Sequence, residues 1–186
     1  MADIKNDLDN IRTRISDSNF LANKGLSNEV GIHVFCYNPR HELIVRDFTE
    51  RITSETSDVF RVIERDLYKI FIELLEDEDV VDAIPDLEED EGKVSLLETL
   101  RNIASTDAFL NKMKYEPHEC GKDVLFLTGV GKVYPFMRSH IMLNAMQKAF
   151  SDIPIIMFYP GTFNGKDLNL FDKFFDGNYY RAFNLL

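Results

Sequence analysis

The spacing of apolar residues at the start of the chain is that of an amphipathic helix. Ile4, Leu8, Ile11 and Ile15 recur at intervals of four, three and four residues, which predicts a helix over residues 3–16. Side chains at this spacing share one face, so the helix is expected to pack on the rest of the fold. The polar stretch 17–30 that follows is expected to be a connection.

Five segments are expected to be β-strands, and those at 123–128 and 154–159 are the most apolar. They cover residues 31–36, 59–64, 123–128, 154–159 and 179–184. Continuous apolar runs are typical of parallel strands that are covered on both faces. The Pro-Gly pair at residues 160 and 161 is expected to end the fourth run, because Pro and Gly interrupt regular structure.

Segments between these runs have helical periodicity. Helices are expected over residues 41–53, 68–75, 93–104 and 106–114, then over a long stretch from Pro135 to Phe150, and around 166–173. Pro135 suits the first turn of its helix. Strands that alternate with helices predict one α/β domain over residues 1–186, a three-layer α/β/α fold with a mainly parallel sheet of about five strands. Such a core is Rossmann-like or P-loop-like in architecture.

Residues 76–115 form an acidic and helical insertion in this pattern. Its dense acidic runs lie within residues 76–92, which Gly92 ends. The positions of interest are Glu78, Asp79, Glu88, Glu89, Asp90 and Glu91. One interpretation of 76–92 is a solvated loop between helices, and the other is a docking surface for a basic protein.

Overall charge and composition narrow the class of protein. A chain of 186 residues with 45% hydrophobic residues can bury a core without disulfides or metals. Its formal net charge of −11 opposes a large nucleic-acid footprint. We expect a cytoplasmic protein, because the charged N-terminus has no signal core and no apolar run has the length of a membrane span. Cys36 and Cys120 are expected to be ordinary thiols, without CxxC spacing.

Ligands of parallel α/β sheets bind beyond the carboxyl ends of the strands, so three loops are candidates here. These loops are residues 37–42, 129–140 and 159–167. The candidate partner or ligand residues in them are Tyr37, Asn38, Arg40, Glu42, Gly129, Gly131, Tyr134, Arg138, His140, Tyr159 and Gly161. The alternative is that these side chains only support the ends of the strands.

In the second of these loops, the pair Gly131-Lys132 stands where a phosphate-binding loop would end, but the motif is incomplete. The first glycine position holds Phe126, and Val133 replaces the hydroxyl residue that would contact Mg²⁺. The dinucleotide fingerprint fails as well, because Tyr134 occupies its third glycine position. We therefore expect no nucleotide hydrolysis. The turn at Gly129 either needs only permissive backbone angles or binds an anion through free NH groups.

No metal, cofactor or catalytic constellation is complete in the sequence. His118, Glu119 and Cys120 are adjacent, and adjacent residues rarely converge on one ion. His33 lies in an expected strand and is interpreted as a core residue. Arg138 and His140 near a helix start are either functional or hydrogen-bonded to opposing loop carbonyls or to Glu42. The Gly-x-Ser-x-Gly nucleophile motif is absent, so no enzyme is indicated.

Four segments together resemble a known family. Residues 31–40 read GIHVFCYNPR, residues 124–140 read VLFLTGVGKVYPFMRSH, residues 153–161 read IPIIMFYPG, and residues 178–183 read NYYRAF. They are similar to the BrxB family, a small component of bacterial BREX phage-defence systems. The resemblance runs from about residue 31 to the end, and residues 76–92 are not part of it.

The resemblance implies a setting and partners but no active site. BREX systems combine a BrxC ATPase, a PglX DNA methyltransferase and a PglZ protein of phosphatase-like fold. We expect a non-catalytic adaptor with a PglZ-type protein as its first partner and BrxC or PglX as further ones. The rival interpretation is a nucleic-acid-binding component that uses Arg40, Lys132, Arg138 and Lys166. A cryptic nucleotide-binding protein or enzyme is the third.

Overall fold

The centre of the molecule is a parallel sheet with the strand order β2–β3–β4–β1–β7. The computed structural model describes residues 3–23, 31–175, 177 and 182–186. The strands are β1 (Ile32–Tyr37), β2 (Arg61–Asp66), β3 (Asp123–Thr128), β4 (Ile155–Phe163) and β7 (Phe183–Asn184). The predicted three-layer α/β fold with a mainly parallel sheet is confirmed. Of the expected last strand, residues 179–181 lie outside the described residues, and Phe183–Asn184 pairs with β1.

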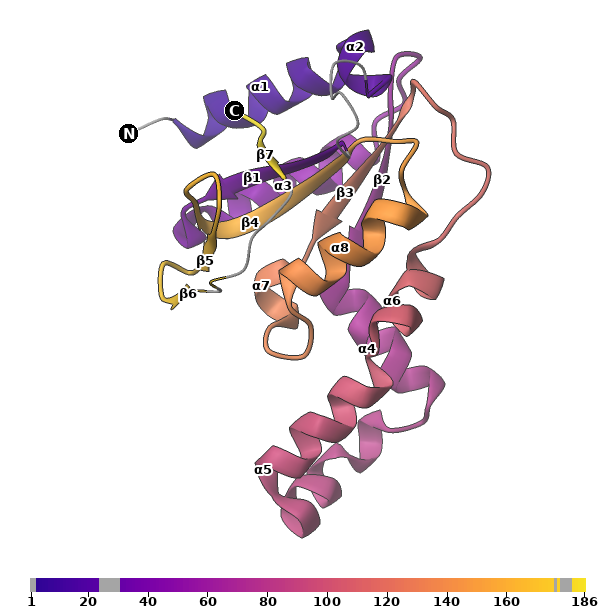
Figure 1. Ribbon diagram of the computed structural model, residues 1–186, viewed down its shortest axis with the longest axis vertical. Coiled ribbons are helices and arrows are strands. Elements are labelled where there is room, and N and C mark those ends of the chain that lie inside the picture. Colours follow the sequence, from indigo (N-terminus) through magenta and orange to yellow (C-terminus); the bar gives the residue numbers. More distant parts are fainter. Residues whose placement is uncertain (1–2, 24–30, 176, 178–181) are drawn as a thin grey trace.

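Helices cover both faces of this sheet (Figure 1). On one face lie α1 (Ile4–Ile15), α2 (Ser18–Leu21) and α3 (Glu42–Thr53), the last entered through the 3₁₀ turn η1 (Pro39–His41). On the other lie α4 (Leu67–Asp77), α6 (Thr106–Met113), α7 (Val130–Val133) and α8 (Ser139–Ala149). The short helix α2 falls in the expected connection 17–30, whose residues 24–30 lie outside the described part.

The side chains of strand β3 pack into two separate hydrophobic clusters, one on each face of the sheet. All six of its residues are buried. Because successive side chains of a strand point to opposite faces, Val124 and Phe126 join the cluster under α1 and α3, and Leu125 and Leu127 join the other. This explains why residues 124–127 are continuously apolar.

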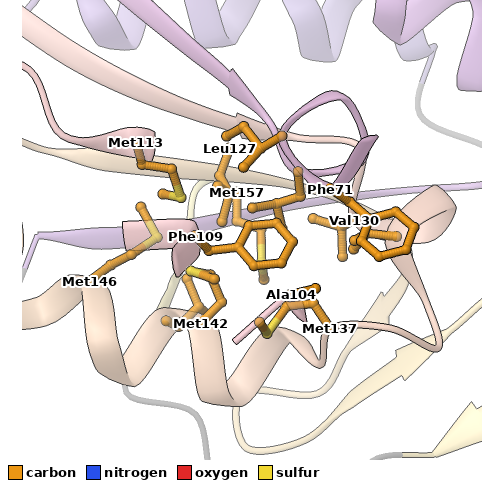
Figure 2. Packing of buried hydrophobic residues seen from close by; sticks show 14 of the residues in the cluster. Phe71, Ala104, Phe109, Met113, Leu127, Val130, Met137, Met142, Met146 and Met157 are labelled. Carbon is orange, nitrogen blue, oxygen red and sulfur yellow. The ribbon is translucent and has the colours of Figure 1, made fainter. Parts of the chain in front are cut away.

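The cluster under α6 and α8 is rich in methionine. Met113, Met137, Met142, Met146 and Met157 surround the ring of Phe109 (Figure 2). An unbranched thioether fills irregular gaps, which suits the junction of several short helices with a sheet.

Residues 76–92 are mostly helical, and the expected loop there is wrong. The 3₁₀ turn η2 (Val81–Ala83) leads into α5 (Ile84–Ile103), whose first turn holds Pro85 without losing a helical hydrogen bond. Gly92, at φ 82° and ψ 165°, kinks α5 instead of ending the segment. Together with the outer part of α4, this helix forms an arm that projects away from the sheet (Figure 1).

Three expectations for the C-terminal third are also wrong. Pro135 does not open a helix, because it lies between α7 and α8 and α8 begins at Ser139. Strand β4 continues through Pro160 and Gly161, since β5 (Leu168–Leu170) pairs with it antiparallel. Residues 166–173 therefore contain a strand where a helix was expected, followed by β6 (Phe174–Phe175). Gly161 permits this pairing, because an added Cβ would meet the Asn169 carbonyl oxygen at 2.1 Å.

Candidate functional site

Within the described residues, three hollows lie near the carboxyl ends of the strands, and the first is a small cleft between α3 and the ends of β2 and β3. Among its lining residues are Tyr37, Glu42, Asp66, Gly129 and Lys132. The buried Tyr37 hydroxyl donates to Glu42 Oε2 at 2.6 Å, and burial together with this carboxylate raises the pKa of Tyr37. Polar groups in this cleft are thus already bound to one another.

The same cleft contains the glycine turn that resembles a phosphate loop. Gly129 has φ 72°, and a Cβ there would meet Asp66 Oδ1 at 2.0 Å. Asp66 also accepts from the backbone NH groups of Tyr68 and Lys69, and Lys132 Nζ lies 3.6 Å from it. A carboxylate of the chain itself therefore occupies the neighbourhood of the turn and pairs with the lysine that would approach a phosphate.

The second hollow lies between β1 and β4. It is about 520 Å³ in volume, and Tyr37, Asn38 and Gly161 are among the residues that line it. Cys36 lines it too, and burial raises the pKa of its thiol to about 12, with a further contribution from Asp172. A thiol with so high a pKa is a poor nucleophile at neutral pH.

The third hollow is a pocket of about 290 Å³ beside α8 and brings Tyr134, Arg138 and Tyr159 together. Lys173 and two exposed rings, Phe174 and Phe175, complete its rim. Within the described residues neither Arg138 nor Lys173 has an ion-pair partner. The pocket combines aromatic walls with two cations.

Arg40, Gly131 and His140 lie outside these linings. Arg40 is exposed on η1, and its backbone NH donates to the Asn38 side chain. Gly131 packs closely against Phe171, and His140 lies in the first turn of α8. The backbone carbonyl of Pro135, in the loop 129–140, accepts two hydrogen bonds from the Arg101 guanidinium, at 2.9 Å and 3.1 Å.

The acidic residues of the insertion all lie exposed on the arm. Glu78 and Asp79 follow α4, whereas Glu88, Glu89, Asp90 and Glu91 lie on α5 before its kink. Residues 76–92 contain ten Asp or Glu and no Lys or Arg, so they supply −10 of the chain's formal net charge of −11. In the described structure only Asp77 and Glu88 of these ten form ion pairs, with Lys112 and Lys93.

The opposite edge of the sheet holds a paired cluster that the sequence did not reveal. Asp123 is fully buried at the start of β3 and accepts from Arg61 Nε and Nη2, both at 2.7 Å, and from Tyr115 at 2.9 Å. Burial raises the pKa of Asp123, but hydrogen bonds from Arg61, Glu119 NH and Tyr115 outweigh it, so its pKa lies below the usual value. This cluster joins β2 to β3.

Of the adjacent residues His118, Glu119 and Cys120, the first and the third contact one carboxylate, and the second points to another partner. His118 Nδ1 lies 2.8 Å from Asp152, and the Cys120 thiol lies 3.5 Å from the same carboxylate, whereas Glu119 pairs with Arg61. Across residues 3–23, 31–175, 177 and 182–186, no three His, Cys, Asp or Glu side chains are placed to hold a metal ion.

His33 is a buried residue of β1, as its strand position indicated. Its ring lies 4.9 Å from that of Phe20 and 5.9 Å from that of Phe183. Burial lowers the pKa of His33 to about 4, with a smaller effect of Arg14. The imidazole is therefore neutral at physiological pH.

Comparison with known proteins decides the family. A family model described as "BREX protein BrxB" matches residues 63–185. A BREX protein BrxB of Bacillus cereus (strain H3081.97) is 38% identical over 196 residues, which cover 100% of this chain and 99% of that protein. This chain belongs to the BrxB family. A second BrxB protein, from Escherichia coli O9:H4 (strain HS), is 28% identical over 179 residues, covering 96% of this chain and 90% of its own length. No solved structure gave a significant match.

The BrxB match includes a region that the sequence resemblance left out. The matched residues 63–185 contain the acidic arm as well as the loops that follow β3 and β4. In the BrxB chain described here, no helix of the described residues has both the length and the apolar character needed to cross a bilayer.

Proposed function

We propose that this BrxB protein is a non-catalytic adaptor of a BREX phage-defence assembly and that a PglZ-type protein is its direct partner. A BrxC-type ATPase and a PglX-type methyltransferase are the proteins that the adaptor would bring near this partner. Holding such components together raises their effective concentration without any chemistry by the adaptor itself. Family membership supports the BREX setting.

The observation that carries the proposal is the exposed acidic arm. Eight of the ten acidic side chains in residues 76–92 have no ion-pair partner among the described residues. Crowded like charges destabilise a fold, so such a surface costs stability when the protein is alone. A basic partner would relieve this repulsion and would be steered to the arm by its field.

The pocket beside α8 offers a second contact surface. Tyr134, Arg138, Phe174 and Phe175 lie together at its rim. Aromatic residues and Arg are enriched at the energetic centres of protein interfaces. An arm and a pocket on separate parts of the surface suit a protein that binds two components at once.

The rival functions receive less support from the geometry. Nucleic-acid binding needs clustered cations, but Lys132 is paired with Asp66 in one hollow and Arg138 lies in another. Nucleotide binding at the glycine turn would place phosphate against the Asp66 carboxylate. Both arguments favour an adaptor.

Co-purification of the tagged protein with each BREX component separately tests the proposal. A variant with Glu78, Asp82, Glu89 and Asp90 changed to Lys should lose its partner by about tenfold or more in affinity. The control variant changes Asp9, Glu50, Asp58 and Glu116 to Lys, four exposed acids elsewhere, with the same change in net charge. The control should keep the partner.

Loop-face variants complete the test. Tyr37→Phe, Arg40→Ala, Tyr134→Ala and Arg138→Ala should leave the fold intact, and those that contribute to an interface should weaken co-purification and phage resistance together. If folded arm and loop variants keep every partner and still lose phage resistance, the adaptor proposal is wrong and a hidden active site explains the protein better.

A further inference from the structure

The acidic arm contains an apolar groove between its two helices. The groove is about 430 Å³ in volume. Its apolar walls are Tyr68, Phe71, Ile72 and Leu75 on α4, Ile84, Leu96, Leu97 and Leu100 on α5, and Phe136 from the segment between α7 and α8. Glu88 and Lys93 are the charged residues of the lining, and they pair with each other at 3.6 Å.

The apolar wall on α4 follows one face of the helix, where Phe71 and Leu75 are buried and Tyr68 and Ile72 reach the surface. Tyr68, Phe71, Ile72 and Leu75 are separated by three, one and three residues, which places them in one row along the helix. At about 1.5 Å per residue this row is roughly 10 Å long, which matches two turns of a bound helix. Phe136 closes the groove, with its ring stacked at 4.3 Å on Phe71.

The arm leaves apolar surface uncovered that a helix pair usually buries. Only Leu96 and Leu100 are fully buried in the twenty residues of α5. Ile84, Leu87 and Leu97 are partly buried, and Tyr68 at the lip is 37% exposed. Apolar surface of this kind, rimmed by charge, is typical of an interaction site.

Charge specifies the occupant. The groove adjoins residues 76–92, which supply −10 of the net charge and contribute Ile84 and Glu88 to its lining, so a cationic ligand is attracted and an acidic one is repelled. The same repulsion opposes a second copy of this chain, because two arms would bring two such segments together.

We propose that this groove binds an amphipathic helix of a partner protein, one that inserts apolar residues at helical spacing and sets Lys or Arg against the acidic rim. This is the helix-in-groove mode of recognition. The inference rests on the proposed adaptor function and specifies the chemistry of the partner segment.

A pair of designed peptides tests the chemistry directly on the full chain. The probe is a labelled helix of about 18 residues with Leu at positions i, i+3, i+4 and i+7 and Lys or Arg on its flanks. Its control carries the same Leu residues with Glu on the flanks. Fluorescence anisotropy should show binding of the basic peptide only, weakened at least about tenfold between 50 and 200 mM salt. Equal binding of both peptides, or of neither, overturns the proposal.

Two substitutions one helical turn apart test the location. Leu97→Gln changes the groove wall, whereas Val94→Gln changes a residue of α5 that is 76% exposed and does not line the groove. Gln supports a helix about as well as Leu, so both variants should fold, as circular dichroism checks. Leu97→Gln should weaken the basic peptide about tenfold and Val94→Gln less than twofold. Should Leu97→Gln unfold the arm, Tyr68→Ala at the exposed lip replaces it with the same expectation.

Partner co-purification separates this inference from the adaptor proposal. If the Lys variant of the arm loses the BREX partner but Leu97→Gln and Tyr68→Ala keep it, the adaptor proposal stands and the groove proposal falls. If no BREX component co-purifies at all while the basic peptide binds as expected, the adaptor proposal falls and the groove remains a helix-binding site. Concentration-dependent dimerisation that Leu97→Gln abolishes, measured by analytical ultracentrifugation, would assign the groove to a second copy and overturn the proposal.

Discussion

Charged side chains are mostly paired around the sheet and mostly unpaired on the acidic arm. Around the sheet, polar side chains are paired within the chain, as in Tyr37 with Glu42, Lys132 with Asp66 and Arg61 with Asp123. On the arm, eight of ten acids have no ion-pair partner in the described structure. At the carboxyl ends of the strands, where α/β proteins usually bind ligands, the polar groups beside β1, β2 and β3 are largely paired with one another, although Arg138 and Lys173 beside α8 have no ion-pair partner in the described part. On the exposed insertion most charges are unpaired.

The contrast concerns what each region has left to offer a ligand or a partner. Self-paired groups stabilise a fold and have little capacity left for a ligand. Unpaired charge costs stability and is useful only when something else binds it. Substitutions in the two regions should therefore have different consequences for stability, and the following four predictions are arranged by the expected size of that effect.

Removal of the buried carboxylate at the sheet edge should have the largest effect. Asp123→Ala leaves Arg61, the Tyr115 hydroxyl and the Glu119 NH without their acceptor. We expect a loss of about 3 kcal/mol in the free energy of unfolding, at the low end for a buried pair because the Arg61 side chain is 39% exposed. Urea unfolding measures it. Asp47→Ala, which breaks the exposed pair Asp47–Arg51 on α3, should cost about 0.5 kcal/mol or less. Equal losses would contradict the comparison.

A matched pair of glycine substitutions gives the next largest effect. Gly129 and Gly92 both have positive φ, at 72° and 82°. An added Cβ meets Asp66 Oδ1 at 2.0 Å in the first case and nothing within 4 Å in the second. Gly92→Ala on the arm should cost about 1 to 2 kcal/mol for the backbone conformation alone, because a positive φ with ψ 165° is adopted almost only by Gly. Gly129→Ala should cost about 2 kcal/mol or more, because Asp66 must also move. Thermal unfolding of the two variants checks the difference, and an equal cost would mean that the turn is less crowded than it looks.

The sheet could be predicted from the sequence because its physical signal is local and strong. Residues 124–127 are apolar throughout, and a strand buried on both faces requires that pattern. The helix over residues 3–16 was equally clear from the spacing of Ile4, Leu8, Ile11 and Ile15. Both predictions are confirmed.

The predictions that were wrong concern segments whose local sequence suggests one structure while contacts with the rest of the fold favour another. Acidic residues and Pro85 suggested a loop at 76–92, but Pro is compatible with a first helical turn and long acidic side chains with an exposed helix. Pro160 and Gly161 suggested a strand end, but β5 pairs beyond them and needs the missing Cβ of Gly161. Pairings across the sheet edge, such as Asp66 with Lys132, join residues far apart in sequence and left no pattern to detect.

The third prediction concerns His33, a titratable group of the sheet that is buried without charge. Its pKa of about 4 lies below the ordinary 6.5, so between these values the unfolded chain binds the proton and the folded chain does not. Stability from this group is complete above pH 6.5 and is lost as the pH falls toward 4. We expect a loss of about 1 kcal/mol between pH 7 and pH 5.5. His33→Phe should remove that part of the pH dependence, which urea unfolding at several pH values measures. If the pH dependence does not change, the pKa of His33 is the same in the folded and the unfolded chain.

The smallest effect, of opposite sign, belongs to the arm. Asp86 and Asp90 are four residues apart on α5, a spacing at which like charges on a helix repel by a few tenths of a kcal/mol. Neutralising Glu78, Asp82, Glu89 and Asp90 with Gln or Asn should therefore raise the free energy of unfolding by about 0.5 kcal/mol at low salt. In 1 M NaCl, where the screening length is about 3 Å, the gain should vanish. The same change at Asp9, Glu50, Asp58 and Glu116 serves as the control and should give no salt-dependent gain. A loss of stability in the arm variant would mean that its acids are engaged within the fold and not held ready for a partner.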